Sequence, residues 1–438
     1  MAIISQYSLF VWEKDLENLG DLKRLQLVLD SLPDEELMRT LEIERGHGRD
    51  DYPVRAMWNL IIAMIVFGHD RFADVIRECG RNVQLRYICG FGVWKIPTAV
   101  NVSRFVVNLE KHQDIITDIF FALVGKLCEL LPGFGEDVAM DSKWVESLAK
   151  RVSDNKKTGR HKSGRRGEHD AEYGKKEYKG RRPDGTEWVT IKSCFGFKLH
   201  VLVDANYELP LAYMVSSAAG SDVVYGKALL EYLEKNKPDI FKRIKHCMAD
   251  RAYDDTALIQ YLKGLGIKAV IDKRDMWKDE LEKELPGYKG IYYNERGEVF
   301  CYSPEYGERH EMRPNGYESE RDALRFQCPA KMYGISCSEA CTCTHTKNIR
   351  IPLETDERIF TQVSRSGYKW GTLYNKRTSV ERVFSRLDVS FGFEEKKLRG
   401  KVRMELLGSI ALIVMNAMAI GRIREKKPDL MRSLVKAA

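Results

Sequence analysis

Long apolar runs are missing from this chain of 438 residues. The two longest, near residues 56–67 and 409–420, are shorter than the roughly 20 residues that a membrane-spanning helix needs, and each contains asparagine. The first residues also lack the cationic segment and the apolar stretch of a secretory signal. We therefore expect both runs to form buried helices of a cytoplasmic protein that has no membrane partner.

A strong overall charge is also absent, since the formal net charge is only +7. The basic residues are concentrated in residues 150–182, where 13 Lys and Arg stand against five Asp and Glu. This Gly-rich stretch is predicted to be a loop, and two interpretations of it remain open. It is either a solvated segment without a partner or a contact with nucleic-acid phosphates through residues such as Arg165 and Arg166.

Cysteine pairs with the spacing of a standard zinc knuckle are missing, although five of the ten cysteines fall within residues 301–343. If this segment holds a structural zinc ion, its candidate ligands are Cys301, Cys328, Cys337 and Cys341. The alternative is a tight insertion with reduced thiols, which are the default in an intracellular protein.

The chain divides into four parts by its patterning. Residues 1–130 contain helical apolar stretches separated by Gly and Pro. Residues 131–271 read as three strands, a helix, a strand, a helix and a strand, which predicts an α/β domain with a mixed sheet. Residues 272–370 interrupt this order and predict an irregular Cys-containing insertion. Residues 371–438 return to a helical period and predict two closing helices.

Two acidic residues occupy strand positions that core packing does not explain. Asp141 lies within the first predicted strand, and Asp250 directly follows the fourth. These two strands can be neighbours in a mixed sheet, which would bring both acids to one end of it. Asp254 and Asp255 precede an apolar helical stripe and are predicted to start that helix.

A third carboxylate, Glu381, lies on the helix predicted after the insertion. At 100° per residue, Tyr374, Arg377, Glu381 and Asp388 fall within an arc of about 60° on that helix. A solvated helix face is the ordinary explanation. However, three carboxylates that converge need cations between them, and hard oxygen ligands suit Mg²⁺ or Mn²⁺. Two such ions in one site support the in-line displacement of a phosphodiester.

Basic and aromatic residues near the expected site are candidate contacts for nucleic acid. Lys198 and His200 share the polar face of the second predicted strand, and we predict that they contact DNA. Tyr368 and Trp370 follow the insertion, where they could stack on an unpaired base or simply pack against the protein.

Several segments in this order resemble the DDE transposases of bacterial insertion sequences. They are AMDSKWV, FGFKLHVLVDANYELPLAYMVSSAAGSD, MADRAYDD, the spacing of Tyr374, Arg377 and Glu381, and the tail KLRGKVRMELLGSIALIVMNAMAI. The resemblance covers about residues 45–420. It implies a ribonuclease-H-like catalytic domain in which Asp141, Asp250 and Glu381 hold two Mg²⁺ or Mn²⁺ ions. It also implies that Tyr374 and Arg377 contact DNA near the cut.

The same resemblance implies a DNA transposase that binds the terminal inverted repeats of its element through the helical N-terminal domain. Such a protein cleaves DNA, joins it to a target as a homodimer or larger complex, and is associated with the nucleoid. One position departs from the group, since Asp388 stands where Lys is usual; Arg386, Lys396 and Lys397 are candidates for the phosphate contact instead. An inactive or repurposed DNA-binding copy and a non-transposing nuclease of the same fold remain as alternatives.

Overall fold

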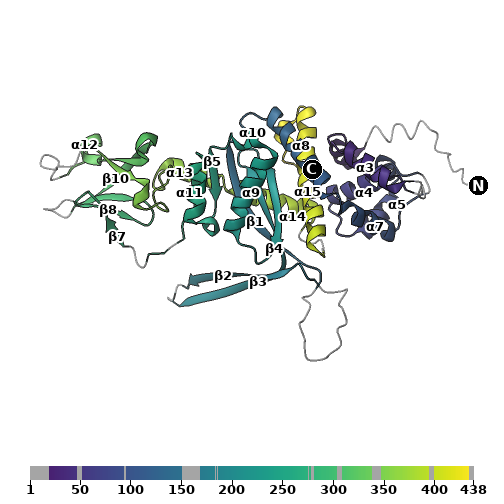
Figure 1. The fold of residues 1–438 in the computed structure, drawn as a ribbon, viewed down its shortest axis with the longest axis horizontal. Helices are drawn as coiled ribbons and strands as arrows, with labels where there is room; N and C mark the ends of the chain where they lie inside the picture. The colour runs from purple at the N-terminus through teal and green to yellow at the C-terminus, as the bar shows by residue number, and fades with distance from the viewer. Residues whose placement is uncertain are drawn as a thin grey trace, which may run out of the picture.

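The protein is elongated, with a helical part at one end, a mixed sheet in the middle and a second sheet at the other end (Figure 1). The structure is a computed structural model. The residues that it describes are 19–46, 52–92, 95–149, 168–182, 184, 186–274, 276–277, 281–302, 308–337, 347–393 and 399–433.

The described residues before position 131 form helices and no strand, as predicted. After the short 3₁₀ turn η1 (Gly20–Leu22), the helices are α2 (Lys23–Leu29), α3 (Glu35–Arg45), α4 (Val54–Val66), α5 (Phe72–Arg81), α6 (Val83–Cys89), α7 (Ala99–Leu109) and α8 (Gln113–Leu130). Local signals set several of their ends. The Asn82 side chain accepts a hydrogen bond from the Leu85 amide at the start of α6, and Gly90 ends that helix with a φ of +93°.

The central sheet has six strands, namely β1 (Asp137–Glu146), β2 (Glu172–Arg181), β3 (Glu187–Asp204), β4 (Leu209–Ser217), β5 (His246–Ala249) and β6 (Lys268–Ile271). Their order is β2-β3-β1-β5-β6, and β4 also pairs with β3. The helices α9 (Asp222–Asn236), α10 (Pro238–Phe241) and α11 (Thr256–Gly264) connect the later strands. Because β1 runs parallel beside β5, the predicted neighbourhood of the first and fourth predicted strands is confirmed.

Strand β2 lies within the stretch that was predicted to be a basic loop. It pairs with the first half of β3 along its whole length, from Glu172 opposite Gly196 to Arg181 opposite Glu187. The loop prediction is therefore wrong for this segment. Exposed side chains on both faces explain the error, since no alternation of apolar and polar residues marks the strand.

The insertion is a second antiparallel sheet rather than an irregular segment. Its six strands follow the order β12-β11-β10-β9-β8-β7. They are β7 (Glu282–Glu284), β8 (Ile291–Asn294), β9 (Val299–Tyr302), β10 (Arg309–Glu318), β11 (Ala323–Gln327) and β12 (Asn348–Pro352), with the short helix α12 (Pro329–Tyr333) after β11. A separate apolar core holds this sheet together, including Ile291, Val299 and Phe326. The strands are mostly of three to five residues, too short to show a clear period.

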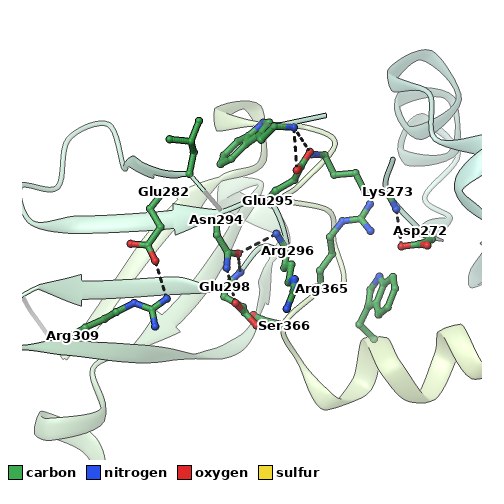
Figure 2. Close-up of a pocket in the computed structure, with 13 residues that line it drawn as sticks. Asp272, Lys273, Glu282, Asn294, Glu295, Arg296, Glu298, Arg309, Arg365 and Ser366 are labelled. Carbon is green, nitrogen blue, oxygen red and sulfur yellow. Dashed lines mark hydrogen bonds and ion pairs between the residues drawn. The ribbon is translucent and has the colours of Figure 1, made fainter. Parts of the chain in front are cut away.

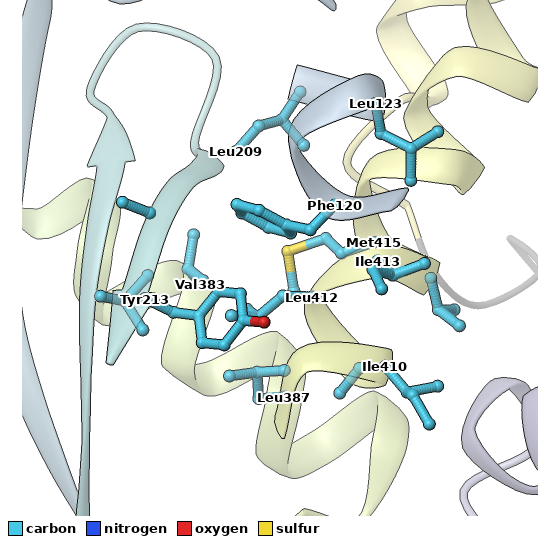
Figure 3. Close-up of a cluster of buried hydrophobic side chains, with 14 of the residues drawn as sticks. Phe120, Leu123, Leu209, Tyr213, Val383, Leu387, Ile410, Leu412, Ile413 and Met415 are labelled. Atoms are coloured by element: carbon cyan, nitrogen blue, oxygen red, sulfur yellow. The ribbon is translucent and has the colours of Figure 1, made fainter. Parts of the chain in front are cut away.

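Three helices close the chain: α13 (Tyr368–Asn375), α14 (Thr378–Phe391) and α15 (Lys401–Arg424). The helix predicted to carry Tyr374 and Glu381 together is thus divided between α13 and α14. Helix α15 is long and apolar enough to cross a membrane, but 89% of its apolar window is buried inside the protein. Its side chains pack against α8, β4 and α14 (Figure 3). The prediction of a buried helix near residues 409–420 is confirmed.

Asp137 joins the two strands of the expected site to the start of α14. Its carboxylate accepts hydrogen bonds from His246 Nδ1 at 2.8 Å, at the start of β5, and from Lys376 Nζ at 2.6 Å, just before α14. The hydrogen bond from His246, and after it that from Lys376, hold the pKa of Asp137 well below its usual range. This ion pair network fixes where the following residues of α14 lie relative to β1.

We predict that Asp137→Asn lowers the free energy of unfolding by about 2 kcal/mol at neutral pH, because charge-assisted hydrogen bonds are lost. A lowered folded-state pKa contributes stability above the unfolded pKa of about 3.9 and loses it as the pH falls through the folded value. The difference between variant and wild type should therefore shrink below about pH 4 in urea unfolding curves. Glu136→Gln, which breaks an exposed pair with Lys245, is the control, and an equal loss in that variant would contradict the prediction.

Candidate functional site

Asp141 and Asp250 lie on adjacent parallel strands. Asp141 is in the middle of β1, and its Oδ1 accepts a hydrogen bond from the Ser142 amide at 2.7 Å. Asp250 directly follows β5 and caps the 3₁₀ turn η2 (Arg251–Tyr253), where its Oδ1 accepts from the Ala252 amide at 2.8 Å. Backbone donors therefore orient both carboxylates.

Ionising Asp141 beside Asp250 is electrostatically unfavourable. Burial raises the pKa of Asp141 to about 7, and the charge of Asp250 adds to this rise. The Ser142 amide, Lys176 and Arg377 oppose it only in part. A divalent cation would remove this cost, and a donor set made of carboxylate oxygens fits Mg²⁺ or Mn²⁺.

Glu381 lies in the first turn of α14 and is half-exposed, with its Oε1 2.7 Å from Arg377 Nη2. The Arg377 charge also interacts favourably with Asp141. In the part of the chain that the structure describes, Asp141, Asp250 and Glu381 do not form a set whose ligand oxygens all lie within 4.8 Å of one another. The structure thus pairs the two aspartates, while Arg377 holds the glutamate at the edge of the same face.

A stacked row of side chains leads from the end of the insertion to Glu381. The Arg365 guanidinium lies 5.7 Å from the centre of the Trp370 ring. Trp370 and Tyr374 stack at 4.7 Å with an interplanar angle of 11°, and the Arg377 guanidinium lies 5.6 Å from the Tyr374 ring. Cation–π contacts at both ends hold Arg377 in place beside Glu381. Trp370 packs within this row, whereas Tyr368 is 92% exposed.

A cavity of about 690 Å³ opens beside this row, between the second sheet and the central one (Figure 2). Trp370 and Arg365 contribute to its lining. Several other charged groups in the wall form ion pairs, such as Lys273, whose Nζ lies 2.5 Å from a Glu295 oxygen. The cavity belongs to the same site, because Trp370 reaches from it to Tyr374.

Lys198 and His200 are buried, so the predicted DNA contacts through them are wrong. His200 is fully buried, with its Nε2 2.8 Å from Ser216 Oγ and its ring stacked on Tyr225 at 4.5 Å. Lys198 is 6% exposed and donates a hydrogen bond to Asp222 Oδ1 at 2.9 Å. Helix α9 covers this face of the sheet. The alternation of polar and apolar residues along the strand does not predict that a helix packs there.

Asp388 forms an ion pair with Lys143, which the sequence did not indicate. Lys143 Nζ lies 2.5 Å from Asp388 Oδ2, and the two side chains are 16% and 20% exposed. Lys143 follows Asp141 by two residues in β1 and therefore lies on the same face of the sheet. The period-2 spacing from Asp141 was the signal that could have found it. A strand lysine thus stands beside the helix position where similar transposases carry Lys.

The other candidates for the phosphate contact are less suitable or not described. Arg386 is committed to Glu208, since it donates to the backbone oxygen of that residue and pairs with its carboxylate. Burial lowers the pKa of Arg386 to about 10. The predicted residues that lie outside the described parts of the chain are Arg165, Arg166, Cys341, Lys396 and Lys397.

The cysteines of the insertion do not gather as predicted. Cys301 and Cys328 pack against the core of the second sheet. The Cys337 sulfur lies instead within 4.8 Å of ligand atoms of His310 and Glu308. Within the described residues, Cys301, Cys328 and Cys337 therefore do not make one ligand set. The predicted set consisted of thiols alone, whereas the side chains that gather include an imidazole and a carboxylate.

The two acids after Asp250 have different roles. Asp255 caps α11, where its Oδ1 accepts a hydrogen bond from the Leu258 amide at 3.0 Å, as predicted. Asp254 is buried and pairs with Arg358, which lies beyond the insertion, and accepts from the Arg274 amide at 2.9 Å. The prediction that Asp254 starts the helix is wrong, because this acid links the chain segments on either side of the insertion.

Two family models match the chain. The one described as "Transposase DDE domain" matches residues 154–417, which include Asp250 and Glu381 but not Asp141. The one described as "Transposase domain (DUF772)" matches residues 12–108. A comparison with curated proteins finds no match. The first match spans more than half of the chain, and with the curled mixed sheet and its flanking helices it confirms the predicted ribonuclease-H-like fold. The chain therefore belongs to the DDE transposase family.

Proposed function

We propose that this transposase binds the ends of an insertion sequence, cleaves a DNA strand there and joins the exposed 3′-hydroxyl to a target. The observation that carries the proposal is the placement of Asp141 beside Asp250 on parallel strands, with Arg377 and Glu381 at the edge of the same face. Carboxylates in such a site, next to a guanidinium, suit a phosphodiester substrate.

Asp141 and Asp250 would hold Mg²⁺ or Mn²⁺, and Glu381 would complete the ligand set. Bound there, such ions would supply the Lewis acidity that an in-line displacement needs at its attacking and leaving oxygens. The Arg377–Glu381 ion pair would couple the binding of the metal ions to the binding of DNA. A DNA phosphate that binds Arg377 competes with Glu381 for the guanidinium, and this releases the Glu381 carboxylate towards the other two acids.

Tyr374 and Arg377 would contact the DNA near the cut, since the stacked row places them beside Glu381. Lys143 is a further cation on the face that carries Asp141, and Asp388 orients it. The Lys143–Asp388 pair supports an active copy, because it puts a lysine ammonium beside the helix position where the resemblance implies Lys.

The partners follow from the reaction. Two element ends must be cut and joined together, so the working form is a homodimer or larger complex in the cytoplasm, associated with the nucleoid when bound to DNA. The helical N-terminal part would recognise the terminal inverted repeats. If the insertion holds a structural zinc ion, Cys337, His310 and Glu308 are the donors that support it.

We predict that Asp141→Asn, Asp250→Asn and Glu381→Gln each reduce Mg²⁺-dependent cleavage of an element end by at least about 100-fold. The two aspartate variants should keep nearly the same DNA affinity, and Glu381→Gln should not lose any, because it frees Arg377 for a phosphate. Asp255→Asn is the matched control, because Asn also caps helices and this acid only starts α11. Gel assays of cleavage and binding measure both properties. Full cleavage by the Asp250→Asn protein would overturn the assignment, and cleavage without joining would favour a non-transposing nuclease.

We predict that Asp388→Lys gives no gain in cleavage and lowers the free energy of unfolding by about 1–3 kcal/mol, because it places two ammonium groups together. The double variant Lys143→Asp, Asp388→Lys re-forms the ion pair in the opposite sense and should recover most of this stability. Urea unfolding and cleavage rates test both variants. A severalfold rise in cleavage by Asp388→Lys alone would show instead that Asp388 impairs the wild-type enzyme.

A further inference from the structure

A two-stranded arm projects from the catalytic sheet. It consists of β2, residues 172–181, and the first half of β3, residues 187–196 (Figure 1). The second half of β3 continues into the buried sheet between β1 and β4. Residues 187–193 are exposed. An isolated two-stranded ribbon buries little apolar surface and is marginally stable in water, so an arm of this kind suggests a binding role.

The two faces of the arm differ in chemistry. Opposite residues in an antiparallel pair share a face, and the register sets Lys176 against Lys192, Tyr178 against Thr190 and Gly180 against Trp188. We call this the lysine face, and along these three pairs it carries no acidic side chain. On the opposite face the register sets Lys175 against Ser193 and Glu177 against Ile191, so along these two pairs a carboxylate lies beside a lysine and an apolar side chain.

The opposed lysines of this face repel each other, and the charge of Asp141 offsets this cost only in part, at Lys176. Like charges directly opposite on neighbouring strands destabilise the pair. Lys176 Nζ lies 5.1 Å from the centre of the Trp144 ring, and Lys192 Nζ lies 5.5 Å from that of Tyr178. Within the described parts of the chain, neither ammonium lies within 4.0 Å of a carboxylate oxygen. An anion bound across the two ammonium groups would remove the repulsion.

Aromatic rings extend the same face towards the tip. Trp188 lies flat across Gly180, where an added Cβ would fall 2.5 Å from the ring. Trp188 and Tyr178 nevertheless remain 38% and 43% exposed. At the base, a Cβ on Gly174 would fall 2.3 Å from the Ala218 oxygen, so the arm is packed closely against the body of the protein. Lysines interleaved with exposed rings on a two-stranded ribbon match the chemistry and the width of a DNA groove.

We infer that the lysine face of the arm binds the phosphate backbone of the DNA duplex that leads away from the catalytic carboxylates. This inference rests on the proposed function, since it takes DNA as the substrate. The arm begins beside the site, because Lys176 is close enough for its charge to act on Asp141. The contact is independent of base sequence, because lysines neutralise phosphates rather than read base edges.

The test compares the full-length double variant Lys176→Gln, Lys192→Gln with the single variant Lys175→Gln, which changes a lysine of the same strand on the opposite face. Affinity for a duplex carrying one element end is measured against salt concentration. The double variant should bind about 10-fold more weakly, and its slope of log affinity against log salt should fall by about 2. Lys175→Gln should leave the slope nearly unchanged. Lys176→Arg, Lys192→Arg should behave like wild type if the charge is what matters.

The outcomes separate this inference from the proposed function. If wild type binds and cleaves the duplex and the glutamine double variant has the same affinity and slope, the arm inference is overturned and the proposed function stands. A change in oligomeric state without a change in the slope would also overturn it and would assign the arm to contacts between copies of the chain. If wild type neither binds nor cleaves the duplex, both proposals fail.

Discussion

Repulsion between the Asp141 and Asp250 carboxylates is the constraint on which the rest of the site depends. Parallel pairing of β1 with β5 brings the two acids together, and burial makes their joint ionisation costly enough to raise the pKa of Asp141 to about 7. A bound divalent cation would offset this cost. The same negative field explains why Arg377 lies over this face and why Glu381 is held at its edge.

Cations around the acids are all held by a second contact. Arg377 is held by the stacked row, Lys143 by Asp388, and Lys376 by Asp137. The contacts of Lys143 with Asp388 and of Lys376 with Asp137 join elements that are distant in sequence, so α14 is positioned by charge as well as by its apolar packing. The lysine face of the arm differs, because its two ammonium groups contact aromatic rings but, among the described residues, lie within 4.0 Å of no carboxylate oxygen.

The prediction from sequence succeeded where local pattern and position agree. The neighbourhood of Asp141 and Asp250 was predicted because acids at strand positions conflict with ordinary core packing. Helix α15 was predicted because an apolar run of its length must be buried. The prediction failed where the sequence pattern does not indicate which elements pack together in space. His200 was taken as exposed because strand alternation does not reveal that α9 covers its face. Strand β2 was taken as a loop because a ribbon exposed on both faces has no apolar period.

The sequence by itself determined the family, since the order of its motifs around Asp141, Asp250 and Glu381 can be recognised without coordinates. Only the tertiary structure decided which charges meet. Lys143 and Asp388 are 245 residues apart, and Asp137 and Lys376 are 239 apart. No local signal links such pairs, because the energy of an ion pair depends on distance in space and on burial, and both are set only when the sheet and the closing helices pack together.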